Sequence, residues 1–204
     1  MSLQIINPLT CPGWDEQLSA NPESSFFHTS AWAKVLCESY GYQPVYFASM
    51  DNGQVENLIP VMEINSFLTG KRGVALPFTD FCPPIISTRE NFQKIVNHVV
   101  PHGKISGWKS LEIRGGDSGV PYSTFYTHIL NLKKNPGDIF SNFKNSTQRN
   151  IKKAEKQGIR VDFSGTFKST KSYYQLHCKT RQHHGLPPQP FHFFKNIYEH
   201  ILSQ

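Results

Sequence analysis

A strand–turn–strand pattern over residues 44–63 constrains the fold of this chain more than any other feature. The segments PVYFASM (44–50) and VENLIPVME (55–63) are rich in apolar and β-branched residues, and they flank Asp51-Asn52-Gly53. Asn-Gly is a strong signal for a tight hairpin turn, because both residues accept the positive φ angles that such a turn requires. The sequence therefore predicts two adjacent antiparallel strands, around which the other elements must form layers.

The rest of the chain alternates between strand-like and helix-like patterns. Further strands are predicted at Gln4–Pro8, Val74–Phe78, Pro84–Ser87, Ser110–Arg114, Ser123–Leu132 and Arg160–Phe163. Helices are predicted at Thr29–Ser39, Asn91–Val100, Pro136–Phe143, Ser146–Gln157, Ser169–His184 and Pro190–Gln204, with Pro101 and Gly103 ending the second of them. This order predicts an α/β or α+β fold with a central, largely antiparallel sheet.

Length and cysteine usage set the broad class. A chain of 204 residues is long enough for one sizeable core, or for one domain plus part of another. Its first residues have neither the basic nor the apolar region of a signal peptide, and no run approaches the roughly 20 apolar residues of a membrane-spanning helix. The four cysteines, Cys11, Cys37, Cys82 and Cys178, form no Cys-x-x-Cys pair. We therefore expect free thiols and a cytoplasmic protein.

The net charge of +6 is unevenly distributed along the chain. Residues 1–132 hold 8 Lys and Arg against 11 Asp and Glu, whereas residues 133–204 hold 13 against 4. A local positive field of this kind indicates an anionic partner, such as a nucleotide-linked sugar, a lipid-linked precursor, RNA or a membrane surface.

A basic stripe carries much of that charge. Arg149, Lys152, Lys153 and Lys156 are spaced i, i+3, i+4 and i+7, so they share one face of the predicted helix 146–157. One interpretation is a surface that binds phosphate or other anionic oxygens. The alternative is a solvated helix face whose long side chains bind nothing.

Four segments, in the right order, resemble the FemABX family of GNAT-related transferases. TQRNIKKAEKQGIRV (147–161) is similar to the family pattern T-x-R-x-I-K-K-A-x-K-x-G-V-x-V, and YYQLHCKTRQHHGLPPQPFHFF (173–194) to the following helix with its R-P-x-x-Y-F segment. SSFFHTSAWAKVL (24–36) looks like the early S/T-x-x-W-x-x-V segment. GVALPFTDFCPP (73–84) is similar to the LPF-x-D stretch of members outside peptidoglycan synthesis.

The resemblance implies a GNAT-like mixed sheet flanked by helices, in a protein with two such units facing a cleft. Residues 1–165 would form one unit, and residues 166–204 would supply the two helices that open a second. The proposed catalytic basic residue of the family belongs to the remainder of that second unit. No catalytic residue is therefore named in this sequence, and we expect this chain by itself to be an inactive fragment.

The family's activity is transfer of an aminoacyl or acyl group to an amine of a cell-wall or envelope-saccharide precursor. The resemblance thus implies an aminoacyl-tRNA donor, with acyl-CoA as the alternative, and an anionic saccharide or nucleotide-linked acceptor, with no bound cofactor. Members that bind a UDP-linked muramyl peptide hold it with a Lys, an Arg and a Tyr. Here those positions are Leu36, Gln189 and Phe193. Because these charge-assisted contacts are absent, we expect a different acceptor, such as an exopolysaccharide or lipid-linked sugar.

Four residues are candidates for the cleft: Asp80, Arg114, Gln189 and Phe193. Asp80, between two phenylalanines, suits either a desolvated general base or the cap of its own turn. Arg114 alternates with Glu112 along a predicted strand, so a cross-strand ion pair explains it as well as a cleft does. Trp32, with Phe26 and Phe27, is expected in the core, and stacking on a sugar is the alternative.

Two other kinds of site find less support in the sequence. RGGDSG (114–119) and RQHHGL (181–186) lack the spacing of the pyrophosphate-binding loop of CoA-dependent acetyltransferases. His177 and His184 are two helical turns apart, with no carboxylate beside them, so no metal site is predicted. A non-catalytic module that binds nucleic acid or an anionic envelope component, and a CoA-dependent N-acetyltransferase, remain the alternatives to the transferase.

Overall fold

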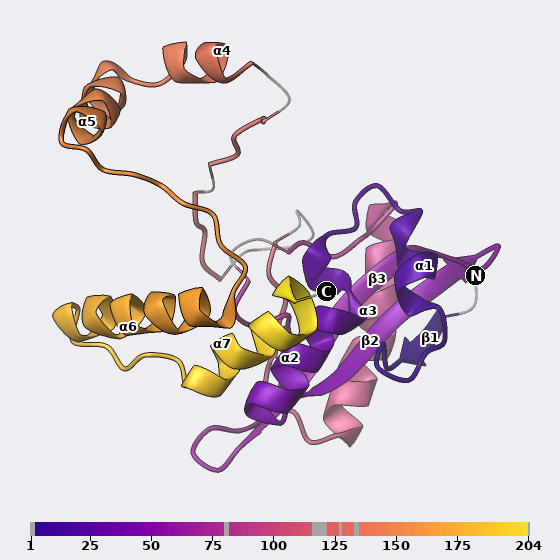
Figure 1. Cartoon of the computed structure of the whole chain (residues 1–204). Coiled ribbons are helices and arrows are strands. Elements are labelled where there is room, and N and C mark those ends of the chain that lie inside the picture. The colour runs from indigo at the N-terminus through magenta and orange to yellow at the C-terminus, as the bar shows by residue number, and fades with distance from the viewer. Residues whose placement is uncertain (1–2, 80–81, 116–121, 127, 133–134, 204) are drawn as a thin grey trace. The chain divides into compact units, whose positions relative to one another are not determined.

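The computed structural model describes residues 3–79, 82–115, 122–126, 128–132 and 135–203. The chain forms two compact units, which are Met1–Val120 with Gly165–Gln204, and Pro121–Ser164. The first unit holds the sheet, and the second holds helices α4 (Pro136–Ser141) and α5 (Asn145–Lys156) (Figure 1). The sequence predicts that one GNAT-like unit ends at residue 165 and that a second begins there. The two compact units do not test this prediction, because they are defined by contacts within the chain and not by resemblance to a known domain.

A single mixed sheet runs through the described part of the first unit, with the strands in chain order. The strands are β1 (Leu3–Ile6), β2 (Gln43–Asp51), β3 (Gln54–Ser66), β4 (Gly70–Ala75) and β5 (Leu111–Glu112). Neighbours are antiparallel except β4 and β5, which are parallel. The predicted mixed, largely antiparallel sheet flanked by helices is confirmed.

The predicted hairpin is the longest pairing in the sheet. β2 and β3 pair from Gln43 opposite Glu63 to Asp51 opposite Gln54. Between them Asn52 has φ 48° and Gly53 has φ 78°, the two positive values that a tight hairpin turn needs.

Helices cover both faces of the hairpin, so its apolar run is buried on two sides. The helices of this unit are α1 (Trp14–Ser19), α2 (Ser30–Tyr40), α3 (Arg89–Ile105), α6 (Phe167–His183) and α7 (Phe191–Ile197), with a 3₁₀ turn η1 (Phe26–His28) and a π-helical turn η2 (Tyr198–Leu202). α2 and α7 pack beside each other over Leu58 and Met62 (Figure 1). α3 packs on Ile59 and Val61. None of the described helices is long and apolar enough to cross a membrane.

The prediction that Pro101 and Gly103 end a helix is wrong. α3 continues to Ile105, and Gly107, at φ 76°, follows its end. Gly103 has a different role, because a Cβ there would lie 2.6 Å from the ring of Trp108. The indole packs against the helix at this point, and its Nε1 donates to Glu63 at 2.6 Å. The burial of the α3 face outweighs the one hydrogen bond that Pro101 cannot donate.

Three predicted strands are absent from the described residues. In Pro84–Ser87, Ile85 forms only an isolated antiparallel bridge with Leu58. Ser123–Leu132, apart from residue 127, and Arg160–Phe163 have no strand pairing, and their large side chains are exposed, Phe125 and Phe163 among them. An alternating pattern becomes a strand only where a neighbouring strand accepts its hydrogen bonds and a core accepts one face. The sequence cannot show whether such a neighbour exists.

The stripe helix forms nearly as predicted, but its start differs. α5 spans Asn145–Lys156, so it begins one residue earlier than predicted, and Lys144 precedes it without a side-chain capping hydrogen bond. The side chain of Gln148 donates to the carbonyls of Ser141 and Phe143, at 3.2 and 2.8 Å. It therefore binds the preceding turn. Gly158, at φ 72°, follows the end of the helix.

Candidate functional site

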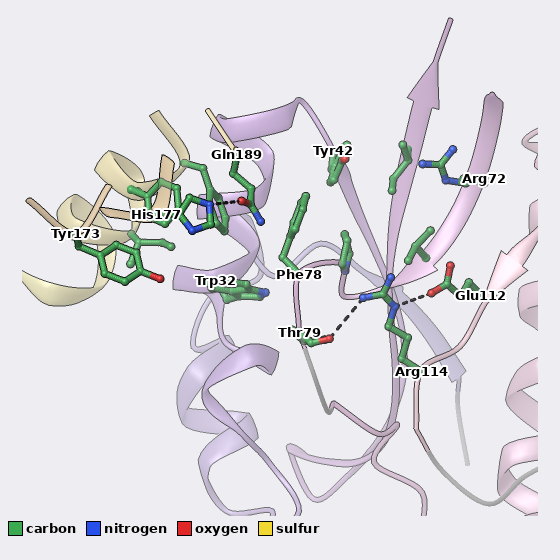
Figure 2. A pocket seen from close by; sticks show the side chains of 16 residues that line it. Trp32, Tyr42, Arg72, Phe78, Thr79, Glu112, Arg114, Tyr173, His177 and Gln189 are labelled. Atoms are coloured by element: carbon green, nitrogen blue, oxygen red, sulfur yellow. Dashed lines mark hydrogen bonds and ion pairs between the residues drawn. The ribbon is translucent and has the colours of Figure 1, made fainter. Parts of the chain in front are cut away.

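A pocket of about 720 Å³ lies within the first unit. It is lined from α2, the end of β3, β4 and its following loop, β5, α6 and α7. Figure 2 shows these side chains converging from elements that lie far apart in the sequence. Aromatic rings form much of the wall, together with two arginines and one carboxylate.

A strained turn shapes the side of the pocket after β4. Leu76 has φ 43° and Phe78 has φ 64°, so two non-glycine residues occupy the left-handed region around Pro77. Such residues cost about 1–3 kcal/mol each and cluster at ligand-binding and catalytic positions. Thr79 holds the turn by donating its hydroxyl to the Leu76 carbonyl at 2.7 Å. The Phe78 ring stacks on Tyr40 with centroids 4.7 Å apart.

An ion pair forms the charged part of the wall. Arg114 Nε donates to Glu112 Oε1 at 2.6 Å, and Arg114 Nη1 lies 3.5 Å from the Thr79 carbonyl oxygen. The sequence left a choice between an ion pair and a cleft role for these residues. The ion pair forms within one chain segment, between residues two apart, so the cross-strand pair is wrong. Both residues line the pocket, and their role in a cleft stays a prediction.

The second arginine of the pocket, Arg72 on β4, has no carboxylate within ion-pair distance among the described residues. Burial raises the pKa of nearby Tyr42, and the positive charge of Arg72 partly opposes that rise. The Tyr42 hydroxyl thus stays protonated at neutral pH and can donate or accept a hydrogen bond.

Polar and aromatic groups of α6 and α7 form the opposite wall. His177 Nε2 and Gln189 Oε1 are 2.7 Å apart, and because an amide oxygen only accepts, the histidine nitrogen donates. The His177 ring lies parallel to Tyr173, with centroids 6.1 Å apart. Among the described residues, no group of three or more His, Cys, Asp or Glu side chains is placed to hold a metal ion.

The structure brings three of the four candidate cleft residues to this one pocket: Arg114, Gln189 and Phe193 all line it. Asp80 lies outside the described residues, although the neighbouring Thr79 is part of the wall. Leu36 lies on α2 and is fully buried in the core. Sequence reasoning missed Arg72 and Tyr173, since a single arginine on a strand and a single tyrosine on a helix carry no local signal for a pocket.

The four cations of the stripe belong to the second unit. Arg149, Lys152, Lys153 and Lys156 are exposed, and none has an ion-pair partner among the described residues. Lys152 Nζ lies over the Phe140 ring, 5.7 Å from its centroid, so a cation–π contact joins α5 to α4. The role of these cations in binding anions stays a prediction.

A Cys–His contact beneath the pocket loop is structural rather than nucleophilic. Cys82 Sγ lies 3.3 Å from His28 Nε2, and both residues are buried. Burial raises the pKa of the Cys82 thiol to about 11, so the thiol is protonated at neutral pH. The Ser25 backbone N–H donates to His28 Nδ1 at 3.0 Å. This bond requires that Nδ1 carries no proton, so the imidazole is neutral.

Acid should therefore destabilise the fold through His28. Burial lowers its pKa below the usual 6.5, so its contribution to stability is complete above pH 6.5 and decreases as pH falls through the lower folded value. We expect a slope of up to about 1.4 kcal/mol per pH unit in the free energy of unfolding between pH 7 and 5. Urea unfolding measured across this range should show a shallower slope for His28→Gln. Parallel curves for the two proteins would contradict this assignment.

Comparison with known proteins shows what part of the chain resembles a known family and which fold it shares. Residues 110–201, from β5 to η2, match the FemAB family. The crystal structure of FemX superposes on all of the chain with a TM-score of 0.68 and 15% sequence identity. The chain therefore has the fold of FemX, and somewhat less than half of it resembles the FemAB family in sequence.

The chain spans 55% of the length of the FemX chain. None of the curated proteins matches its sequence significantly. The family match contains both the stripe helix α5 and the α6–α7 segment, where the resemblance in the sequence is strongest.

Proposed function

We propose that the chain is part of a cytoplasmic transferase that moves an aminoacyl group from tRNA to an amine of a cell-envelope or exopolysaccharide precursor. The observation that carries this proposal is the convergence of Arg114, Gln189 and Phe193 on one pocket in a chain that resembles the FemAB family. Arg114 follows β5, whereas Gln189 and Phe193 lie around the start of α7, about 75 residues farther along the chain.

The pocket is the proposed acceptor site. Its strained Leu76–Phe78 turn, its aromatic wall and its paired Arg114 and Glu112 are features of a preformed binding site rather than of a packing defect. Gln189 and Phe193 replace an arginine and a tyrosine that the family resemblance assigns to diphosphate and sugar binding. The acceptor proposed here therefore differs from a UDP-linked muramyl peptide.

The basic helix α5 is the proposed contact for the donor. Its four exposed cations have the i, i+3, i+4, i+7 spacing that presents several positive charges to a polyanion. In the transfer, the acceptor amine attacks the ester carbonyl of the aminoacyl group. An amide bond forms, the ester bond breaks, and the tRNA ribose hydroxyl leaves with a proton. Positioning and general acid–base catalysis are sufficient for this step.

A transfer assay tests the proposal. The protein is incubated with tRNA charged with radiolabelled amino acids and with a purified lipid- or nucleotide-linked saccharide fraction, and label on the saccharide is counted. Transfer that Arg114→Gln reduces at least tenfold would support the acceptor site. Binding of both substrates without transfer favours a binding module, and transfer from acetyl-CoA alone favours an N-acetyltransferase.

A further inference from the structure

Two large apolar side chains are exposed side by side at the tip of the β3–β4 hairpin. The turn between these strands is Phe67-Leu68-Thr69; Phe67 is fully exposed and Leu68 is 89% exposed. In Figure 1 the loop that follows β3 projects from the end of the sheet (Figure 1). Turns normally carry polar residues, as the β2–β3 turn Asp51-Asn52-Gly53 does. An adjacent Phe-Leu pair adds nothing to the core here, so it indicates contact with something outside the chain.

Local contacts hold this turn in shape. The Thr69 backbone N–H donates to Ser66 Oγ at 3.3 Å, and Arg72 Nη1 donates to Thr69 Oγ1. The chain on both sides of the tip is thereby tied together, and the two apolar side chains are left pointing into solvent. The exposure of Phe67 and Leu68 is therefore a feature of a formed turn.

Cations lie beside the tip. After α3 the chain passes next to the start of β4, where the Lys109 backbone N–H donates to the Lys71 carbonyl at 2.8 Å. The Lys109 side chain lies over Gly70, since a Cβ built on that glycine would be 2.8 Å from Lys109 Nζ. Lys104, in the last turn of α3, is exposed at the same end of the unit.

Carboxylates are scarce around these cations. Residues 64–79 and 91–111 contain no Asp or Glu. Glu63, which precedes the tip, is already engaged, because Lys71 Nζ lies 3.0 Å from it and the Trp108 indole donates to it at 2.6 Å. Lys104 and Lys109 have no ion-pair partner among the described residues. Their positive field is therefore available to an anionic surface.

We infer that the β3–β4 tip docks this unit on an anionic lipid bilayer. Phe67 and Leu68 enter the interfacial region of the bilayer, while Lys104 and Lys109 contact the headgroups of anionic lipids. Apolar insertion combined with nearby cations is the two-part attachment that holds a protein on a membrane surface. A narrow tip penetrates a deformable bilayer, whereas a specific protein interface needs a broader area of about 800 Å² on each partner.

This inference goes beyond the proposed transfer reaction. The tip is made of other residues than the proposed acceptor pocket and the proposed donor helix α5. Membrane docking can therefore fail while the proposed reaction stands, and the reverse also holds.

Vesicle sedimentation with the whole chain tests the inference. Vesicles of phosphatidylcholine alone and of phosphatidylcholine mixed with phosphatidylglycerol are compared at several salt concentrations. We expect binding to the mixed vesicles at least fivefold tighter than to the neutral ones, and weaker binding as salt rises, because about fivefold in affinity comes from each cation near an anionic surface. Equal binding to both kinds of vesicle, or binding to neither, would overturn the inference.

Two double variants separate the apolar and the charged parts of the tip. Phe67→Ser with Leu68→Ser should weaken binding to the mixed vesicles at least about tenfold, since two apolar side chains no longer leave water. Lys104→Gln with Lys109→Gln should weaken it by about 5- to 25-fold. All four side chains are exposed, so the thermal unfolding curves of both variants should match that of the native chain.

Matched controls change similar side chains elsewhere. Val161 and Phe163 are also exposed, and their double replacement with serine should leave vesicle binding unchanged. The basic helix α5 offers the rival attachment, and replacing its Arg149, Lys152 and Lys153 with glutamine tests it. Vesicle binding that is lost in the α5 variant but kept in both tip variants would contradict docking through the tip.

A fluorescent reporter shows whether the tip enters the bilayer. Phe67→Trp adds an indole at the tip, and the native chain gives the baseline because its own tryptophans are buried or half-buried. Lipids with brominated acyl chains should quench the added emission, and they should not quench the indole of a Phe163→Trp control. Absence of quenching at position 67, or vesicle binding that the tip variants leave unchanged, overturns the inference and favours a protein partner for this tip.

Discussion

Replacing Arg149, Lys152 and Lys153 with glutamine is expected to weaken tRNA binding by about 100- to 500-fold at about 0.1 M salt. The three side chains are exposed on α5 and have no carboxylate partners among the described residues, so they are free to contact phosphates. Each phosphate contact releases about 0.9 counterions, which is worth about eightfold in affinity at this salt concentration. The slope of log K against log salt should fall by about three. Filter binding or fluorescence anisotropy at several salt concentrations measures both quantities.

A matched control removes the same charge elsewhere. Lys168, Lys171 and Lys179 are exposed on α6, and their replacement with glutamine also lowers the net charge by three. This control should reduce tRNA affinity by only a few times, through the long-range field alone. Equal effects of the two triple variants, or an unchanged salt slope in the α5 variant, would remove α5 from the donor site. The solvated-face interpretation would then hold.

Gly73→Ala is expected to destabilise the fold by about 3 kcal/mol. A Cβ at this position would lie 2.5 Å from the Trp108 ring. The ring has little room to retreat, because its other side packs on α3 at Gly103, where an added Cβ would lie 2.6 Å from it. Moving the ring would also disrupt the bond from Trp108 Nε1 to Glu63. The cost combines overpacking with the loss of a hydrogen bond to a charged group. Urea unfolding followed by circular dichroism measures the difference.

Two further proteins test the cause of this destabilisation. Gly165→Ala is the control, because its Cβ would meet only the Leu202 carbonyl oxygen, at 3.8 Å, and its φ is not in the left-handed region. Its free energy of unfolding should change by less than about 0.5 kcal/mol. In a Trp108→Leu background, Gly73→Ala should cost much less than in the native chain, since the smaller side chain leaves room. A cost that persists there would show that the indole is not responsible.

The elements that the sequence predicted well depend on local interactions. The hairpin follows from Asn52 and Gly53, whose conformational freedom is a property of the residues themselves. Helix α2 follows from apolar periodicity and from the Thr29 side chain, which accepts from the Trp32 N–H, and α5, α6 and α7 follow from the side-chain pattern within each helix. The end of α3 was mispredicted because Gly103 serves a contact with Trp108, five residues farther along, rather than a helix stop.

The pocket was only partly predictable. Arg114, Gln189 and Phe193 were candidates because each lay in a recognisable segment, but nothing in the sequence placed them together or added Arg72 and Tyr173 to them. Nothing in the sequence indicated that Trp32 Nε1 would lack a hydrogen-bond partner. A missing hydrogen-bond partner is defined by everything that surrounds an atom, and those surroundings come from segments more than a hundred residues apart.

The sequence by itself determined the hairpin, most of the helices, the concentration of positive charge after residue 132, and the resemblance of residues 110–201 to the FemAB family. Only the tertiary structure decided that Ser123–Leu132 and Arg160–Phe163 form no strands among the described residues, and that Arg72, Phe78 and Trp32 share a wall. The physical reason is the range of the interactions. A turn or a helix is stabilised by contacts among near neighbours in the chain, whereas a strand needs a partner and a pocket needs several elements brought together by the core.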